Sequence, residues 1–232
     1  MINKKINHAL IMAAGRGIRM VPLTNQIPKA MAPLNGTTLI ANGIRELKKY
    51  IKNIHITVGY KREILSSHVM FNNVNTIINS TNRGNCWWIF NSVISTINEP
   101  IFVLTCDNVV DLNFDQLSLD FFDLKQPDCM IVPTKPVDDL EGDFIIKSVD
   151  NLIKSINRKN VSELMCSGVQ ILNPRNINKK YKMCDNFYDL WSQIIKSKSI
   201  YCSNINPSFW YAVDNIDQLK SLNKSYKFEN EK

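Results

Sequence analysis

The sequence predicts an α/β fold built on a doubly wound, mainly parallel sheet with a small antiparallel addition. Apolar runs of strand length alternate with stretches of helical period between residues 8 and 107. The first of these runs is continuously apolar, as expected for a parallel strand that is buried on both faces. One run ends in a glycine-rich loop and another in a carboxylate, and the ligand crevice of such a sheet lies beyond the strand ends.

Each element of this first part has its own signal. The helix expected over 39–50 places Ile40, Ile44 and Leu47 on one face, which predicts that this face packs on the sheet. The repeated order of strand and helix is typical of Rossmann-like sheets. The expected strands cover 8–13, 53–60, 75–79 and 101–107, and the expected helices cover 39–50, 62–69 and 87–96.

The second part of the chain has a different pattern. Short apolar runs at 129–133, 144–147 and 168–172 are separated by turns, which predicts antiparallel additions to the sheet. Helical patterns return at 186–196 and 216–226. The chain has no internal repeat and no linker rich in proline and glycine, so a single domain over 1–232 is expected.

Composition excludes several classes of protein. The chain has 232 residues, of which 44% are hydrophobic and 21% charged, as in ordinary globular proteins. No apolar run approaches the roughly 18 residues of a membrane helix. The first apolar stretch ends too early, at Ala14-Gly15-Arg16, for a signal peptide, so a cytoplasmic location without membrane insertion is expected. The six cysteines form no Cys-x-x-Cys pair, which favours reduced thiols over a zinc site.

The net charge of +7 arises in the first 70 residues, because the rest of the chain is slightly acidic. No dense basic run with interleaved aromatic residues occurs, so nucleic acid is not an expected partner. A binding site for a polyphosphate accounts for the basic residues equally well. An RNA-binding domain is the competing hypothesis, and it predicts a steep salt dependence of binding to generic RNA.

The most informative segment reads AAGRGIRMVPLT from Ala13 to Thr24. Small residues at 13–15 and 17 allow backbone N–H groups to close around an anion, and Arg16, Arg19 and Lys29 add positive charge. These features predict a triphosphate site. The Walker motif G-x-x-x-x-G-K-[ST] is absent, and the dinucleotide motif G-x-G-x-x-G does not fit because Met occupies position 20.

This string resembles the opening signature of the sugar-phosphate and choline-phosphate nucleotidyltransferases, L-x-A-A-G-x-G-x-R-[ML]-x-P-L-T followed by P-K. Later segments resemble the family too, namely Leu104–Asn108, Ser167–Leu172 and Trp210–Asn215. The resemblance covers residues 8–222 and implies a nucleotidyltransferase fold of the glycosyltransferase-A type. The positions that match the opening signature are Leu10, Ala13 to Gly15, Gly17, Arg19, Met20, Pro22 to Thr24, Pro28 and Lys29.

The resemblance also assigns roles to residues. Asp107 and Asp214 would hold Mg²⁺, the expected cofactor, because this hard cation prefers oxygen ligands. Arg19 would stabilise charge on the departing pyrophosphate. Lys29 would bind the α-phosphate and the incoming acceptor. Such a reaction gathers several negative charges, so catalysis is largely positioning and charge neutralisation. Simpler interpretations remain open, in which Asp107 caps a strand end and Asp214 begins a helix.

Contacts to the two substrates are assigned in the same way. Residues 1–128 are expected to bind the nucleotide and 129–226 the acceptor. Asn79 can equally be a residue that merely ends its strand, and the aromatic residues can equally belong to the core. The expected nucleotide contacts are Met12, Ala13, Ala14, Gly15, Arg16, Gly17, Asn79 and Gly84; the expected acceptor contacts are Lys29, Gly168, Trp88, Tyr188 and Tyr211.

The segments 79–88 and 188–191 resemble the cytidylyltransferase branch of the family most. This implies CTP and a phosphorylated small molecule of the phosphocholine or phosphoglutamine kind, used in capsule or surface-glycan modification. Ala212 departs from the branch, because phosphocholine enzymes tend to have an acidic residue there. This departure puts a cationic acceptor in doubt. An acidic turn, Asp138, Asp139, Glu141 and Asp143, could meet the amine or hydroxyls of an acceptor or could be a solvated loop.

Two other functions remain open. A sugar-1-phosphate nucleotidylyltransferase that uses UTP, GTP or dTTP would share the motifs. Hexapeptide repeats are absent, so a second, acyltransferase activity is not expected. A catalytically silent homologue would usually have lost Arg19, Lys29 or one of the two carboxylates, whereas all four residues are present. The sequence makes no prediction of oligomeric state.

Overall fold

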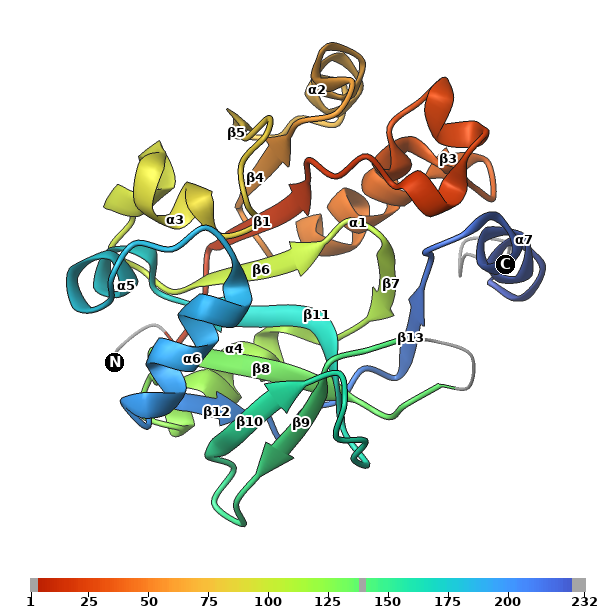
Figure 1. Ribbon diagram of the computed structural model, residues 1–232. Coiled ribbons are helices and arrows are strands. Elements are labelled where there is room, and N and C mark those ends of the chain that lie inside the picture. Colours follow the sequence, from red (N-terminus) through yellow and green to blue (C-terminus); the bar gives the residue numbers. More distant parts are fainter. Residues whose placement is uncertain (1–3, 138–140, 227–232) are drawn as a thin grey trace.

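The computed structural model describes residues 4–137 and 141–226, so Asp138 and Asp139 of the expected acidic turn lie outside the described residues. Four parallel strands form the core of its central sheet (Figure 1). All four were expected from the apolar runs. In spatial order they are β5 (Thr76–Asn79), β4 (Asn53–Val58), β1 (His8–Ala13) and β6 (Ile101–Thr105).

The sheet continues beyond β6 with the strands of the second part of the chain. Strand β11 (Met165–Leu172) runs antiparallel to β6, and β8 (Cys129–Thr134) runs antiparallel to β11. The hairpin of β9 (Phe144–Lys147) and β10 (Ile153–Asn157) extends from the start of β11, and β12 (Ile200–Cys202) lies parallel to β8. A mixed sheet with a parallel core and antiparallel additions is therefore confirmed, and the addition is larger than expected.

Helices cover both faces of the sheet (Figure 1). Successive side chains along each strand point to opposite faces of the sheet, so the hydrophobic core has two parts, one on each face. Ile11 and Phe102 pack on the face of α1, α2 and α4, while Leu10 and Val103 pack on the face of α3, α5 and α6. The helices are α1 (Leu39–Lys48), α2 (Arg62–Met70), α3 (Trp87–Asn91), α4 (Phe114–Asp123), α5 (Pro174–Lys180), α6 (Phe187–Lys196) and α7 (Ile216–Ser225).

The helix expected over 87–96 is interrupted. It ends at Asn91, and a 3₁₀ turn follows over Val93–Thr96. Between the two, Ser92 adopts an extended backbone, and its hydroxyl accepts a hydrogen bond from the Ile94 amide. Ser competes with helical hydrogen bonding in this way, which ends α3 after five residues.

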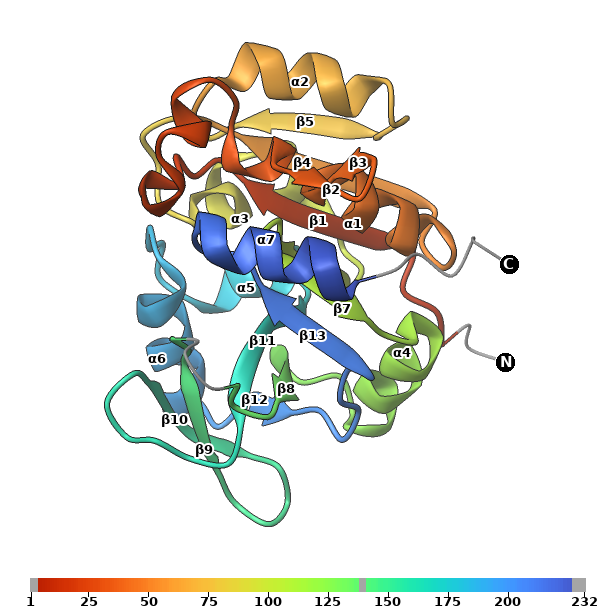
Figure 2. The same ribbon diagram turned by 90° about the vertical axis from the view of Figure 1, so that its right-hand side faces the viewer.

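A smaller two-stranded sheet joins distant parts of the chain. Strand β7 (Asn108–Asp111) pairs antiparallel with β13 (Phe209–Ala212), which leads directly into α7 (Figure 2). A hydrogen bond from the Val213 amide to the Asp107 carbonyl, 2.9 Å, closes this junction. The pairing therefore brings the end of β6 beside the start of α7. The short hairpin of β2 (Pro33–Leu34) and β3 (Thr37–Thr38) lies against α7.

The segment between β1 and β2 carries the opening motif and is folded into three 3₁₀ turns, Ile18–Met20, Leu23–Asn25 and Lys29–Met31. None of these turns was expected from the sequence. Within residues 4–137 and 141–226, none of the helices is both long and apolar enough to cross a membrane.

Candidate active site

The loop after β1 depends on a glycine that contacts Lys29. Gly17 has a φ of +66°, and a Cβ atom there would lie 2.7 Å from the Cβ of Lys29. The carbonyl of Gly17 accepts hydrogen bonds from the Thr24 hydroxyl and the Met20 amide, both at 3.0 Å. Only glycine fits this conformation and this close approach. The loop therefore sets the position of the Lys29 side chain.

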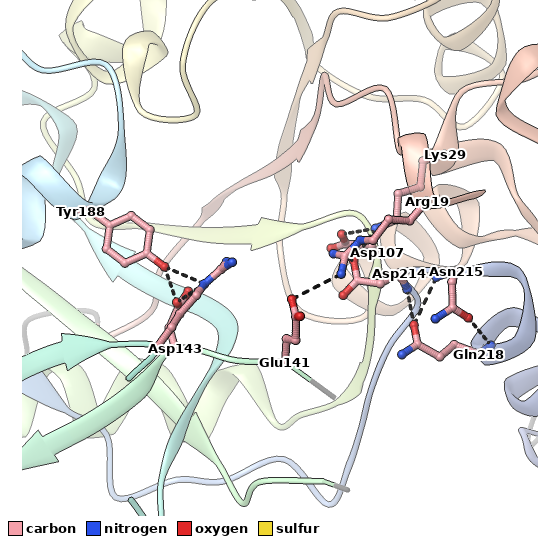
Figure 3. A network of polar contacts seen from close by, with 10 residues as sticks. Arg19, Lys29, Asp107, Glu141, Asp143, Tyr188, Asp214, Asn215 and Gln218 are labelled. Carbon is pink, nitrogen blue, oxygen red and sulfur yellow. Dashed lines mark hydrogen bonds and ion pairs between the residues drawn. The ribbon is translucent and has the colours of Figure 1, made fainter. Parts of the chain in front are cut away.

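Lys29 lies at the centre of a cluster of charges (Figure 3). Its ammonium group is 2.6 Å from Oδ2 of Asp107 and 2.9 Å from Oδ1 of Asp214. The guanidinium of Arg19 also contacts Oδ1 of Asp214, at 2.9 Å. Lys29 is only 9% exposed. Burial disfavours its charged form, but the two carboxylates outweigh burial and raise the pKa of the ammonium.

Asp107 and Asp214 come from strand and helix ends that are far apart in sequence. Asp107 follows β6, and Asp214 precedes α7. The carboxamide of Gln218 accepts hydrogen bonds from the amides of Asp214, at 2.7 Å, and Asn215, at 3.2 Å. Asn215 in turn accepts from the Gln218 amide, which completes a capping box. The start of α7 therefore holds Asp214 in place.

A cavity of about 440 Å³ opens on one side of this cluster, at the carboxyl ends of the parallel strands. Gly84 and the residues of the opening motif meet here, as expected. Thr57 also lines the cavity, although it was not among the expected contacts, as do Ser80, Asn82, Arg83 and Asn85 of the 79–88 segment, in which only Asn79, Gly84 and Trp88 were expected to contact a substrate. The residues that line this first cavity are Met12, Ala14, Gly15, Gly17, Arg19, Lys29, Thr57, Ser80, Asn82, Arg83, Gly84, Asn85, Trp88, Thr105, Cys106, Asp107 and Asp214.

Three expected nucleotide contacts lie outside the lining of the first cavity. Ala13 is 2% exposed, in the core, and its amide donates to the Thr57 hydroxyl. Arg16 lies over the ring of Tyr60, 5.4 Å from its centroid. The side chain of Asn79 accepts hydrogen bonds from the amide and hydroxyl of Thr81, so it caps the end of β5. The position of Asn79 therefore matches the alternative interpretation, in which it is a residue that ends its strand.

A distant segment anchors the nucleotide side of the site. Asp185 accepts hydrogen bonds from the amide of Gly84 through Oδ2, 3.1 Å, and from the amide of Cys86 through its carbonyl, 3.2 Å. The side chain of Asn85 accepts from the Phe187 amide at 2.9 Å. A Cβ atom on Gly84 would lie 1.8 Å from the Asp185 carbonyl oxygen, so glycine is required for this approach. The sequence carried no signal for Asp185.

A second cavity, of about 340 Å³, lies on the other side of the charge cluster. Arg19, Asp107 and Asp214 line both cavities, so the charged cluster stands at their junction. Gly168 and Tyr188, two of the expected acceptor contacts, line this second cavity. The other residues in its lining are Met12, Asn85, Thr105, Asn108, Ile131, Glu141, Gly142, Asp143, Arg158, Cys166, Val169, Gln170, Phe187, Trp191, Trp210 and Ala212.

Two other expected acceptor contacts, Trp88 and Tyr211, are not in the lining of the second cavity. Trp88 lines the first cavity, is 1% exposed and donates its indole N–H to the Asn85 carbonyl. Tyr211 packs against a hydrophobic cluster that includes Leu219 and Leu222 of α7, because successive side chains of a strand point to opposite faces of the sheet. Its neighbour Trp210 faces the second cavity and donates to the Ser167 carbonyl, 2.7 Å. Lys29 lies in the lining of the first cavity.

Gly168 allows two strands to approach closely. Its φ is +79°, and a Cβ atom there would lie 2.1 Å from Nδ2 of Asn108 and 2.7 Å from Oγ1 of Thr105. That Asn108 amide group donates to the Ser167 carbonyl at 2.7 Å. The wall of the second cavity therefore depends on glycine at position 168.

Opposite charges line the second cavity away from Lys29 (Figure 3). Oδ1 of Asp143 accepts hydrogen bonds from Nε of Arg158, 3.0 Å, and from the Tyr188 hydroxyl. Burial, followed by the hydrogen bond to Asp143, raises the pKa of Tyr188 to about 12. Glu141 lies between this network and the Lys29 cluster in Figure 3 and contacts Arg19 at 3.5 Å. Two members of the expected acidic turn, Glu141 and Asp143, thus belong to the cavity.

Asp107 and Asp214 both contact the Lys29 ammonium and each keep one carboxylate oxygen for a further partner. Oδ1 of Asp107 and Oδ2 of Asp214 make no hydrogen bond to other described residues. Carboxylate oxygens are the ligands that Mg²⁺ prefers. In the described part of the chain no group of three or more His, Cys, Asp or Glu residues is arranged for metal binding. A metal ion would therefore need substrate oxygens besides these two carboxylates.

Solved structures with the same fold cover nearly the whole chain. A CTP:phosphocholine cytidylyltransferase from Streptococcus pneumoniae matches with a TM-score of 0.75 at 22% identity, over 94% of this chain and 99% of that one. A UDP-glucose pyrophosphorylase matches with a TM-score of 0.76 at 18% identity, over 95% and 98%. At these identities the likeness shows the fold, which is that of nucleotidyltransferases.

Sequence relatives fall into two groups. A choline-phosphate cytidylyltransferase of Streptococcus pneumoniae is 24% identical over 96% of this chain and 99% of its own. A bifunctional protein GlmU of Methanococcus aeolicus is 30% identical, but over only 44% of this chain and 25% of that protein. The GlmU relatives are thus matched over a quarter of their length or less. The family model for nucleotidyl transferases matches residues 8–227, and the chain belongs to this family.

Proposed function

We propose that this protein is a Mg²⁺-dependent cytidylyltransferase that transfers CMP from CTP to a phosphorylated small molecule and releases pyrophosphate. One observation carries the proposal: the cluster of Lys29, Asp107, Asp214 and Arg19 stands at the junction of two cavities. A reaction between two bound phosphates requires positive charge and a metal site at such a junction.

The first cavity, built mainly by residues 1–128, suits the nucleotide, and residues 129–226 contribute much of the second, which suits the acceptor. An acceptor phosphate oxygen would attack the α-phosphorus, forming a P–O–P bond while the bond to the β-phosphate oxygen breaks. Lys29 would orient the α-phosphate and the attacking oxygen. Arg19 would stabilise the negative charge on pyrophosphate as it leaves. Asp107 and Asp214 would hold Mg²⁺, which supplies charge neutralisation at the α-phosphate.

The choice of CTP and of acceptor has separate support. The full-length relative is named for choline phosphate, and a 2-aminoethylphosphonate cytidylyltransferase of Lancefieldella rimae is 42% identical over 62 residues. Both names describe cytidylyl transfer to a small compound that contains nitrogen and phosphorus. We therefore favour CTP with an acceptor of the phosphocholine or phosphoglutamine kind. The proposal extends to a role in capsule or surface-glycan modification. It also extends to a cytoplasmic location, which the free thiols support.

Pyrophosphate release tests this proposal. CTP, UTP, GTP, ATP and dTTP are each tested with Mg²⁺ against phosphocholine, phosphoglutamine and a panel of sugar 1-phosphates. Release with CTP and an acceptor other than a sugar is the expected result. Release with a sugar 1-phosphate would instead assign a sugar-nucleotide enzyme. If no pair reacts while a triphosphate still raises the unfolding temperature, a catalytically silent homologue replaces the proposal.

A further inference from the structure

The network in the second cavity leaves polar atoms of both signs unpaired. Asp143 uses Oδ1 for both of its hydrogen bonds, from Arg158 and Tyr188. Its Oδ2 makes no hydrogen bond to another described residue. Arg158 uses only Nε, which contacts Asp143 and the Tyr188 hydroxyl at 3.1 Å. Its two terminal nitrogens likewise have no partner among the described residues. The pair therefore offers an acceptor oxygen beside two donor groups.

Asp143 is held in place by the backbone and by Tyr188, whereas the side chain of Arg158 is 64% exposed and contacts only Asp143 and Tyr188 among the described residues. The Asp143 carbonyl accepts a hydrogen bond from the Cys166 amide of β11 at 2.8 Å, and its side chain is only 21% exposed. Tyr188 comes from α6 and joins both members of the pair. Asp143, Arg158 and Tyr188 all line the cavity that also contains Asp107 and Asp214. The pair therefore faces the same cavity as the two carboxylates of the charge cluster.

The free nitrogens of Arg158 and the free oxygen of Asp143 favour some acceptors over others. A carboxylate fits the two free nitrogens of Arg158 as a charge-assisted, bidentate partner. A primary ammonium beside it can donate to the free oxygen of Asp143. A trimethylammonium group has no N–H to donate, so it leaves this oxygen of Asp143 without a hydrogen bond. Ala212 lines the same cavity and adds no negative charge that would favour a cation.

We propose, resting on the proposed function, that Arg158 and Asp143 determine acceptor specificity by binding an amino-acid-type zwitterion and disfavouring a quaternary ammonium. Arg158 contacts the carboxylate of the acceptor and Asp143 its ammonium group. Tyr188 is a positioning residue that fixes Arg158 against Asp143. The predicted acceptor class is a phosphorylated compound that carries both charges at the end away from its phosphate.

Three probes of graded chemistry test this proposal: phosphocholine, phosphoethanolamine and O-phosphoserine. They share a two-carbon spacing between phosphate and nitrogen. Phosphoethanolamine adds N–H donors, and O-phosphoserine adds a carboxylate as well. Their Kd values are measured by calorimetry on the full chain with Mg²⁺ and α,β-methylene-CTP, which prevents transfer. We expect O-phosphoserine to bind about tenfold or more tightly than phosphocholine, the gain typical of charge-assisted hydrogen bonds.

Substitutions test which residue is responsible for the tighter binding of each probe. Arg158→Gln is expected to remove the advantage of O-phosphoserine over phosphoethanolamine while the Kd of the CTP analogue stays unchanged. Asp143→Asn is expected to bring phosphoethanolamine close to phosphocholine. Arg62→Gln is the matched control, because Arg62 also pairs with a carboxylate through Nε, at 2.8 Å, but lines neither cavity.

Several results would overturn the inference: phosphocholine binding as tightly as O-phosphoserine, none of the three probes binding, or Arg158→Gln weakening all probes and the CTP analogue equally. The last would show a structural role instead. Because these are binding measurements, they do not depend on turnover. Failure of the proposed function would appear separately, as absence of pyrophosphate release from CTP with every acceptor.

Discussion

Replacing Lys29 by methionine removes the positive charge from between two carboxylates. In the native protein the ammonium lies 2.6 Å from Asp107 and 2.9 Å from Asp214. Loss of one preorganised charge in an active site typically lowers turnover by about 10²- to 10³-fold, or roughly 3–4 kcal/mol of transition-state stabilisation. We expect a loss of this size in pyrophosphate release, with the acceptor that the native enzyme uses.

The same substitution has a smaller effect on stability. Asp107 and Asp214 are 27% and 20% exposed, so water screens their mutual repulsion in part. Breaking a fully buried ion pair costs about 3–5 kcal/mol, and for this half-buried cluster we expect about 1–2 kcal/mol. For a chain of this size that lowers the unfolding temperature by roughly 2–8 °C. The variant therefore remains folded at 25 °C, and its activity can be measured.

Lys220→Met is the control, because Lys220 forms an exposed ion pair with Asp217 on the same helix that follows Asp214. It should retain native activity and stability. A folded Lys29→Met protein that releases pyrophosphate at the native rate would refute the role of the ammonium in catalysis. Equal losses in the two variants would show that the effect is not specific to the cluster.

Three further predictions follow from the geometry. Gly168→Ala should destabilise the protein by about 1–3 kcal/mol more than Gly36→Ala in urea unfolding, because both glycines have φ near +80° but only Gly168 has close neighbours; equal losses would contradict the predicted clash with Asn108. Asp185→Asn should raise the KM for CTP about three- to tenfold with little change in kcat, because it weakens the hydrogen bond to the Gly84 amide; an unchanged KM would show that this anchor does not order the cavity. Burial, and then the charge of His8, lowers the pKa of His55 from 6.5 to about 4. The unfolded chain therefore binds the extra proton as pH falls, and the free energy of unfolding should fall by about 2 kcal/mol between pH 7.5 and pH 5. His55→Gln should flatten this dependence, and a native curve without the slope would contradict the burial of neutral His55.

The parallel core could be predicted from sequence because its signal is local. A strand buried on both faces is typically a continuous apolar run, and β1 and β6 are close to one, whereas β4 alternates apolar residues with Asn53, His55 and Thr57. Asp107 could be placed because it directly follows such a run. Among the strands that were missed, β10 carries polar residues and β12 has only three residues, so their pairing partners and not their composition determine them.

The rest of the site depends on contacts between distant segments. Asp185 reaches Gly84 across a separation of 101 residues, and nothing near either residue indicates the other. Tyr211 was expected to contact the acceptor, whereas its neighbour Trp210 faces the cavity, because the pairing of β13 with β7 decides which side chain points inward. Arg158, 64% exposed, resembles any solvated surface charge until Asp143 is seen beside it. Binding of substrates by the expected residues stays a prediction.

The product of the reaction tests the central claim most directly. The native enzyme and Asp214→Asn are incubated with Mg²⁺, CTP and each phosphorylated acceptor, and the products are identified by mass spectrometry. We predict a CDP-linked acceptor and pyrophosphate in equal amounts from the native enzyme, and a loss of about 10²-fold or more in the variant, as for other charge-stabilising groups. A CDP-linked product made equally fast by the Asp214→Asn variant, or a product only from UTP, GTP or dTTP with a sugar 1-phosphate, would contradict the account.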